Sequence, residues 1–185
     1  MRNLDFGKYT FVNYTNLNKE ELELILLERN KKTVRQWMNN SNKISWEQHI
    51  TFIKTLDLSK EKRYWLVKRN NKPVGAVYIV DIDLVKNEGV WGYYLFEQFQ
   101  GTGWGIEVEF FALAVFFKYL KLNNVLGYVH KKNINSLSLQ PIFNFKKTGE
   151  SENQIFLKLS KVDYDQLPDE LMEFKIKKVL NNGNT

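Results

Sequence analysis

The chain has 185 residues, no cysteine, and 27 Lys and Arg against 21 Asp and Glu, which gives a formal net charge of +6. The missing cysteine excludes disulfides, thiolate metal sites and cysteine nucleophiles, and only two histidines are present, which argues against a histidine-rich metal site. An apolar fraction of 43% is typical of a folded globular chain, and the length predicts one domain over residues 1–185.

The distribution of charged and apolar residues bears on partners and location. Asp5 lies where a signal peptide would be apolar, and the longest apolar run, residues 110–117, is too short to cross a bilayer. Lys and Arg are scattered without a long basic run, which favours a small polyanionic ligand over nucleic acid. We therefore expect a cytoplasmic protein with no nucleic-acid or membrane partner and no metal, and a homodimer is left open.

The first third of the chain predicts one strand and two helices. Residues 9–14 alternate in part between apolar and polar side chains, as in a strand. Asn16 or Asn18 can cap a helix that runs to about residue 30. Residues 34–40 are less regular, and Ser45 with Gln48 three positions later forms a capping box for the second helix.

The rest of the chain predicts mainly strands and hairpins. A hairpin is expected around an Asn-Asn-Lys-Pro turn, and a further hairpin follows a short helix near the end of the domain. The predicted strands are 63–69, 74–82, 90–96, 125–130, one beginning at 145, and 154–159; the predicted helices are 104–120, 133–140 and a C-terminal helical tail from about 165, centred on 168–182.

The long helix 104–120 connects strands 90–96 and 125–130. A crossover of this kind makes the two strands parallel and is right-handed. The expected fold class is therefore α/β (α+β), with a central mixed, mostly antiparallel sheet flanked by helices and one parallel βαβ crossover. A ligand is expected at the C-terminal ends of the parallel strands.

A glycine-rich turn, Gln-Gly-Thr-Gly-Trp-Gly at 100–105, joins the first of these strands to the long helix. Glycines permit close approach of a ligand to the backbone, and the N–H groups that begin a helix have no intrahelical partner. Together they form a cradle for phosphate. The turn lacks the Lys-Ser/Thr of a Walker A loop and the glycine spacing of a dinucleotide fingerprint. A turn that only packs the helix on the sheet is the alternative.

The order of elements and this turn resemble the GNAT superfamily of acyl-CoA N-acyltransferases. Gln100, Gly103 and Gly105 match the family's Gln/Arg-x-x-Gly-x-Gly/Ala signature, and Asn133, Ser136 and Phe145 match the landmarks after its fifth strand. The resemblance covers about residues 9–160 and implies acetyl-CoA as donor. The implied acetyl-CoA-binding residues are Tyr94, Leu95, Phe96, Gln100, Gly101, Thr102, Gly103, Trp104, Gly105, Asn133 and Ser136.

The N-terminal half also resembles the acetyltransferases that act on UDP-4-amino-4,6-dideoxy sugars in pseudaminic acid synthesis. Arg29, Trp37 and His49 carry this narrower resemblance, which implies a small-molecule nucleotide-sugar substrate. Other roles remain open for each residue. Arg29 either binds phosphate or interacts favourably with the dipole at the C-terminal end of its own helix. Trp37 either packs in the core or stacks on a base, and His49 either contacts phosphate or only lies in the first turn of its helix.

The chain departs from the family at the general acid. The family usually places a Tyr where this chain has Gln140, and an amide cannot donate a proton near neutral pH. Tyr128 and His130 share a face of strand 125–130 and are the candidate replacements, although a core tyrosine with a satisfied hydroxyl and a solvated histidine are the favoured explanations. Protonation by water and weak or absent activity are the remaining explanations.

Three other functions compete with a nucleotide-sugar N-acetyltransferase. A ribosomal-protein-type N-terminal acetyltransferase would share the fold and the donor. A non-catalytic acyl-CoA-binding module would explain Gln140. A nucleic-acid binder is suggested by the net charge alone.

Overall fold

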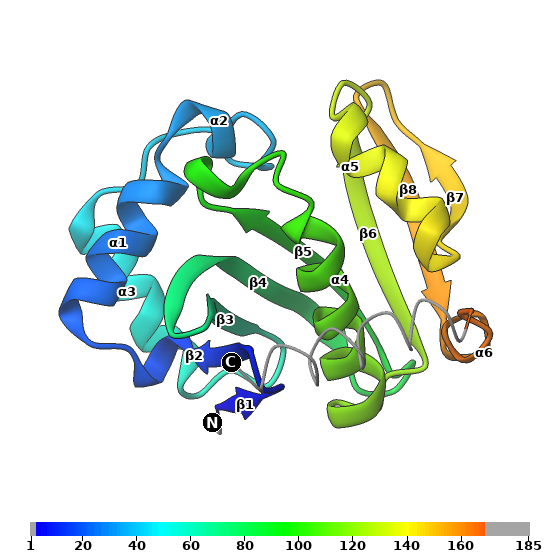
Figure 1. Ribbon diagram of the computed structural model, residues 1–185, viewed down its shortest axis with the longest axis horizontal. Helices are drawn as coiled ribbons and strands as arrows, with labels where there is room; N and C mark the ends of the chain where they lie inside the picture. Colours follow the sequence, from blue (N-terminus) through cyan, green and yellow to red (C-terminus); the bar gives the residue numbers. More distant parts are fainter. Residues whose placement is uncertain (1–2, 169–185) are drawn as a thin grey trace, which may run out of the picture.

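The structure is a computed structural model that describes residues 3–168, and these residues build one sheet in the order β1-β2-β3-β4-β5-β6-β8-β7 (Figure 1). The strands are β1 (Leu4–Asp5), β2 (Tyr9–Asn13), β3 (Arg63–Arg69), β4 (Lys72–Asp83), β5 (Glu88–Leu95), β6 (Asn124–His130), β7 (Lys146–Glu150) and β8 (Gln154–Ser160). Neighbouring strands are antiparallel except β5 and β6, which are parallel. The expected mixed, mostly antiparallel sheet with one parallel crossover is confirmed.

Six α-helices within residues 3–168 surround the sheet, and local capping signals define where several begin. Asn18 and Ser45 each form a capping box, with Glu21 and Gln48 respectively, so the two N-terminal helices begin where the sequence predicts. The helices are α1 (Lys19–Arg29), α2 (Lys32–Arg35), α3 (Trp46–Leu56), α4 (Trp104–Ala114), α5 (Ile134–Leu139) and α6 (Lys161–Asp165).

The two faces of the sheet pack against different helices, because side chains alternate along a strand. On one face Trp65 of β3 and Trp91 of β5 contact Phe116, which lies just beyond α4. On the other face Tyr64 of β3 packs edge-on against Phe52 of α3, with ring centroids 5.0 Å apart. We call these the α4 face and the α3 face.

Several elements differ from expectation. Strand β1 was not predicted, and the irregular stretch after α1 contains the short helix α2. The long helix ends as α-helix at Ala114 and continues as a π-helix over Val115–Tyr119, in which Val115, Phe116 and Phe117 remain in the core. The short helix α5 ends at Leu139 and is followed by a 3-10 turn that contains Pro141. The predicted C-terminal tail lies almost entirely outside the described residues.

Strands β5 and β6 pair over only four positions, from Glu88 with Asn124 to Trp91 with Gly127. Beyond this point the two ribbons diverge (Figure 1). β6 in contrast pairs with β8 along its whole length, from Asn124 to His130. The parallel strands therefore separate at their C-terminal ends, and this separation positions the site.

Candidate active site

A cavity of about 400 Å³ opens where β5 and β6 separate. Its walls come from the ends of these strands, the glycine-rich turn, α5 and the segment around α2. The lining residues are Thr33, Val34, Trp37, Met38, Tyr78, Trp91, Gly92, Tyr93, Tyr94, Leu95, Gln100, Gly101, Gly103, Gly105, Ile106, Gly127, Tyr128, Val129, His130, Asn133, Asn135, Ser136, Leu139 and Gln140. No Asp, Glu, Lys or Arg is found among these described lining residues.

The glycine-rich turn lies at the cavity as predicted, and its glycines have different roles. Gly101 and Gly103 have φ angles of +75° and +81°, and a Cβ on either would meet open space, so the left-handed backbone is what requires glycine there. Gly105 is crowded instead, since a Cβ would lie 3.1 Å from the Tyr93 hydroxyl. Gln100 donates from Nε2 to the Leu95 carbonyl (3.2 Å), which ties the turn to the end of β5.

The backbone of β5 offers hydrogen-bond donors to the cavity. The N–H of Phe96 donates to the carbonyl of Val74 in β4 (2.9 Å), so Gly92, Tyr94 and Phe96 direct their backbone groups toward β4. By alternation, the N–H groups of Tyr93 and Leu95 point to the side where β6 has diverged. Of Tyr94, Leu95 and Phe96, the strand residues among the expected acetyl-CoA ligands, only Leu95 therefore directs its N–H into the gap.

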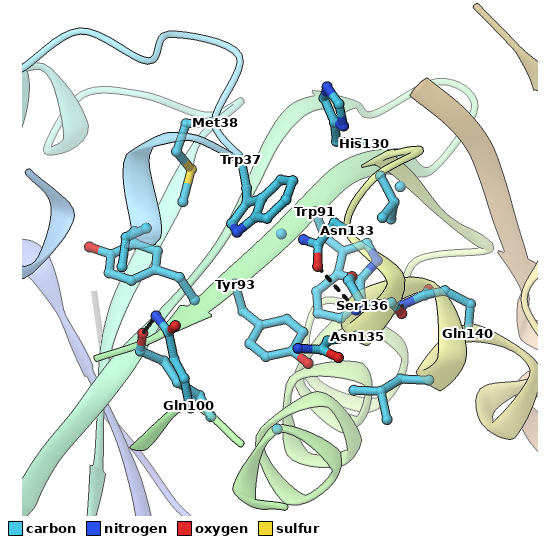
Figure 2. A pocket seen from close by; sticks show the side chains of 18 of the residues that line it. Trp37, Met38, Trp91, Tyr93, Gln100, His130, Asn133, Asn135, Ser136 and Gln140 are labelled. Atoms are coloured by element: carbon cyan, nitrogen blue, oxygen red, sulfur yellow. Dashed lines mark hydrogen bonds between the residues drawn. The ribbon is translucent and has the colours of Figure 1, made fainter. Parts of the chain in front are cut away.

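Helix α5 begins at the cavity with Asn133, whose side-chain oxygen accepts from the Ser136 N–H (3.2 Å; Figure 2). This bond leaves the Asn133 amide nitrogen as a donor on the cavity side. Gln140 is 5% exposed and donates from Nε2 to the Ser136 carbonyl (3.1 Å). The position that usually carries a tyrosine therefore holds an amide that is hydrogen-bonded to its own helix.

The α3 side of the cavity is rich in aromatic side chains. Trp37 and His130 approach each other from opposite walls, with ring centroids 5.7 Å apart (Figure 2). The Nδ1 of His130 accepts from the Lys132 N–H (3.1 Å), so in its neutral form this imidazole carries its proton on Nε2. Tyr128 is 44% exposed and packs edge-on against Phe156. Both candidate acids thus line the cavity, and their roles remain predictions.

Two residues expected to bind the nucleotide sugar lie behind the cavity wall instead of lining it. His49 is 6% exposed, and this burial lowers its pKa, although a hydrogen bond with the backbone of Leu22 on α1 opposes the change. Arg29 donates to the Asn40 carbonyl (2.5 Å), and burial lowers its pKa although Tyr94 and Tyr78 lie close enough to oppose this. Of the three expected residues, Trp37 alone is among the described lining residues.

Three expected acetyl-CoA ligands also lie outside the lining of the cavity: Phe96, Thr102 and Trp104. Phe96 is 1% exposed in the core. Trp104 stacks on Phe99 on the side of the β3–β4 hairpin, where the Arg69 guanidinium lies 4.4 Å from its ring. These side chains therefore pack against the turn on the side away from the cavity.

Sequence reasoning did not identify several residues that the fold brings to the cavity, among them Trp91, Tyr93 and Tyr78. Trp91 stacks between Tyr93 and Phe145 with both interplanar angles at 16°, over Gly127 where the strands separate. For Trp91 and Tyr93, the sequence offered one signal: both lie on the predicted strand 90–96, whose side chains alternate between the two faces of the sheet.

Within residues 3–168, no cluster of His, Asp or Glu side chains is arranged to hold a metal ion. No helix in that same range combines the length and the apolar character that a membrane crossing requires.

Comparisons with known proteins agree with this geometry. The Acetyltransferase (GNAT) domain family matches residues 13–140. Acetyltransferase PseH of Campylobacter jejuni subsp. jejuni serotype O:23/36 (strain 81-176) is 31% identical over 156 residues, which cover 84% of this chain and 96% of that protein.

Two solved structures illustrate the likeness in three dimensions. The crystal structure of Campylobacter jejuni N-acetyltransferase PseH in complex with acetyl coenzyme A aligns with a TM-score of 0.69 and 26% identity, covering 82% of this chain and 98% of that one. The spermidine N-acetyltransferase from Vibrio cholerae, in complex with CoA and spermine, aligns with a TM-score of 0.79 over 87% of this chain and 100% of that one. Its 16% identity supports the shared fold alone. The chain therefore belongs to the GNAT family of acyl-CoA N-acetyltransferases.

Proposed function

We propose that this enzyme transfers the acetyl group of acetyl-CoA to the amino group of a nucleotide-linked 4-amino-4,6-dideoxy sugar, as in the synthesis of pseudaminic acid for a surface polysaccharide or flagellin glycan. The donor's pyrophosphate rests on the glycine-rich turn from Gln100 to Gly105. The pantetheine arm runs along β5, where Tyr93 and Leu95 offer backbone N–H groups to it and to the thioester carbonyl. Asn133 contacts the arm from the opposite wall. We place the reaction in the cytoplasm, where acetyl-CoA is available.

The observation that carries the acceptor assignment is the composition of the cavity on its α3 side. Trp37, Tyr78, Tyr94 and Tyr128 line it, with no charged side chain among the described lining residues. Aromatic faces and hydroxyl groups suit the apolar face and the hydroxyls of a sugar ring. The diphosphate of the nucleotide would lie beyond the mouth of the cavity, and the likeness to PseH over most of both chains supports the same acceptor class.

The same lining disfavours the other acceptors. A polyamine carries several positive charges, and a site for it needs carboxylates, which the described lining does not contain. Likeness in fold to a spermidine N-acetyltransferase therefore carries no acceptor specificity here. An extended peptide N-terminus calls for an open groove, whereas Trp37 and His130 come within 5.7 Å of each other across this cavity.

The test is a transfer assay with acetyl-CoA and a panel of amines that contains UDP-4-amino-4,6-dideoxy sugars, the corresponding dTDP sugars, spermidine and a peptide N-terminus. Mass spectrometry identifies the acetylated product, and release of free thiol gives the rate. Acetylation of the nucleotide sugars with the highest kcat/KM is the expected result. A preference for spermidine or for the peptide would refute the proposed acceptor, and no turnover with any amine would favour a non-catalytic acyl-CoA-binding module.

A further inference from the structure

The reaction needs a group that protonates the departing thiolate, and the usual position cannot supply one. Gln140 is an amide whose nitrogen is engaged by the Ser136 carbonyl. On the proposed function the donor's thioester runs along β5, which would put the reacting atoms near the point where β5 and β6 part, at Trp91 and Gly127. The group required is therefore a proton donor that reaches this point from the acceptor side.

Tyr78 has the geometry that this role requires. It lies on β4 directly across from Gly92 of β5, and both residues belong to the α3 face. A Cβ on Gly92 would lie 2.4 Å from the Tyr78 hydroxyl oxygen and 2.6 Å from its Cζ. The ring therefore lies over the bare Cα of Gly92 and carries its hydroxyl across β5 toward the gap. Any larger residue at position 92 would prevent this placement.

The packing behind Tyr78 holds the ring in this position. Tyr64 of β3 stacks on it with centroids 5.3 Å apart and an interplanar angle of 19°. Of all the tyrosines on the α3 face, only Tyr78 combines a ring that crosses β5 with a place in the cavity lining next to the strand separation. We propose that Tyr78 is the catalytic acid that protonates the CoA thiolate in place of the tyrosine missing at position 140.

Tyr93, Tyr94 and His130 of the cavity are less suited to the same task. The Tyr93 side chain is on the α4 face, where its hydroxyl lies against Gly105 and interacts with the buried Glu109. The Tyr94 hydroxyl is engaged with Tyr14. His130 has its Nδ1 occupied by the Lys132 N–H and lies against Trp37 at the mouth.

The surroundings of Tyr78 keep its proton in place and still permit its transfer. Burial raises the pKa of Tyr78, so the hydroxyl is protonated at neutral pH. The Arg29 guanidinium opposes this rise and therefore favours a transient phenolate. Arg29, expected to bind substrate, thus acts here as a positioning residue that works through Tyr78.

Every proton and electron pair in the acyl transfer is accounted for. The neutral amine attacks the thioester carbonyl carbon, a C–N bond forms, and the carbonyl electron pair moves to the oxygen, which the β5 N–H groups stabilise. The intermediate collapses, the C–S bond breaks with its electron pair on sulfur, and sulfur takes the Tyr78 proton. The nitrogen then gives its surplus proton to the Tyr78 oxygen, so that the enzyme returns to its starting state.

The test compares Tyr78→Phe with the wild type, using the best amine that the wild type acetylates. The assignment of Tyr78 rests on the proposed acyl transfer but not on the identity of the acceptor, so a failed nucleotide-sugar assay leaves it testable with another amine. We expect kcat to fall by about 100-fold, the lower range for loss of a general acid, with the KM for acetyl-CoA unchanged. Tyr164→Phe is the control, because it removes the hydroxyl of a buried tyrosine that lies outside this cavity.

A second donor separates proton transfer from a structural effect. The second donor is S-(4-nitrophenyl) thioacetate, whose leaving group, 4-nitrothiophenolate, departs without protonation. Tyr78→Phe should therefore lower kcat/KM for this donor by less than about threefold. A loss of kcat below about fivefold with acetyl-CoA, or equal losses with the two donors, would overturn the role of Tyr78. Circular dichroism and thermal unfolding of both variants establish that the fold is retained.

Discussion

The ionic contact beneath α4 leads to a sharp prediction about stability. The carboxylate of Glu107 accepts from the Tyr9 hydroxyl (2.8 Å) and pairs with Lys8 Nζ (2.8 Å), and Arg69 Nε is 3.9 Å away. The side chains of Lys8 and Glu107 are only 9% and 11% exposed. Glu107→Gln preserves the shape of the side chain and an acceptor for Tyr9, but it leaves the buried ammonium of Lys8 without its counter-charge.

The size of the effect follows from the separation and the burial. At 2.8 Å and an effective dielectric constant of about 20, the attraction between the two charges is about 6 kcal/mol before desolvation is counted. Removing one partner of a buried pair typically costs about 3–5 kcal/mol, because the other charge stays buried. Lys8 can recover part of this loss by extending toward solvent, so we expect Glu107→Gln to lower the free energy of unfolding by about 3 kcal/mol.

Urea denaturation followed by circular dichroism measures this change. With an m-value of about 2 kcal/mol/M, a loss of about 3 kcal/mol moves the midpoint by about 1.5 M. Lys8→Met in the Glu107→Gln background should restore at least half of the loss, since it removes the stranded charge. The control is Glu23→Gln, which breaks the ion pair between Glu23 and Lys19. The side chains of Lys19 and Glu23 are 70% and 53% exposed, so this change should lower the free energy of unfolding by less than about 0.5 kcal/mol.

Two results would contradict this reasoning. A loss below about 1 kcal/mol for Glu107→Gln would mean that the pair contributes no more than a surface contact. A second substitution at Lys8 that brings no recovery would mean that the cost arises elsewhere, for example in the packing of Tyr9.

Three further predictions concern the turn, the buried imidazole and the mouth of the cavity. Gly103→Ala should lower the free energy of unfolding by about 1 kcal/mol and weaken acetyl-CoA binding in calorimetry, because φ at this position is +81°. Gly103→Asn should lose less stability. Equal losses of stability in the two variants would contradict the backbone argument. The lowered pKa of His49 means that the unfolded state takes up its proton first as the pH falls, so stability should decrease below about pH 6.5. His49→Gln should flatten this dependence in urea titrations. Trp37→Ala should raise the KM for the amine about tenfold and leave the KM for acetyl-CoA unchanged in steady-state assays; the reverse pattern would place Trp37 on the donor side.

Local chemistry made much of the fold predictable. The caps at Asn18 and Ser45 and the turn at Gln100–Gly105 depend on neighbours within a few positions, so the sequence alone indicates them. The crossover through α4 follows from the order of strands and helix, and this order predicts a ligand at the C-terminal ends of the parallel strands, where the cavity lies.

The missed features depend on contacts between distant segments. That Tyr78 lies over Gly92 follows from the register of β4 and β5, which a pattern of apolar residues does not specify to one residue. His49 has the residue type and position of a phosphate ligand, yet the packing of α3 on α1 turns it inward. The side chain of an amphipathic residue at a helix start can face either way, and only tertiary structure decides which.

The place of β8 in the sheet has a consequence for how the enzyme is assembled. β8 lies between β6 and β7, although it follows both in the chain. β6 pairs with β8 at seven positions, from Asn124 with Ser160 to His130 with Gln154, but with β5 at only four. During synthesis from the N-terminus, strands β1 to β5 can pair as each emerges, whereas β6 gains most of its hydrogen bonds only after residue 160 has left the ribosome. A nascent chain that ends within β7 would hence leave the β6 edge unpaired and open to chaperones.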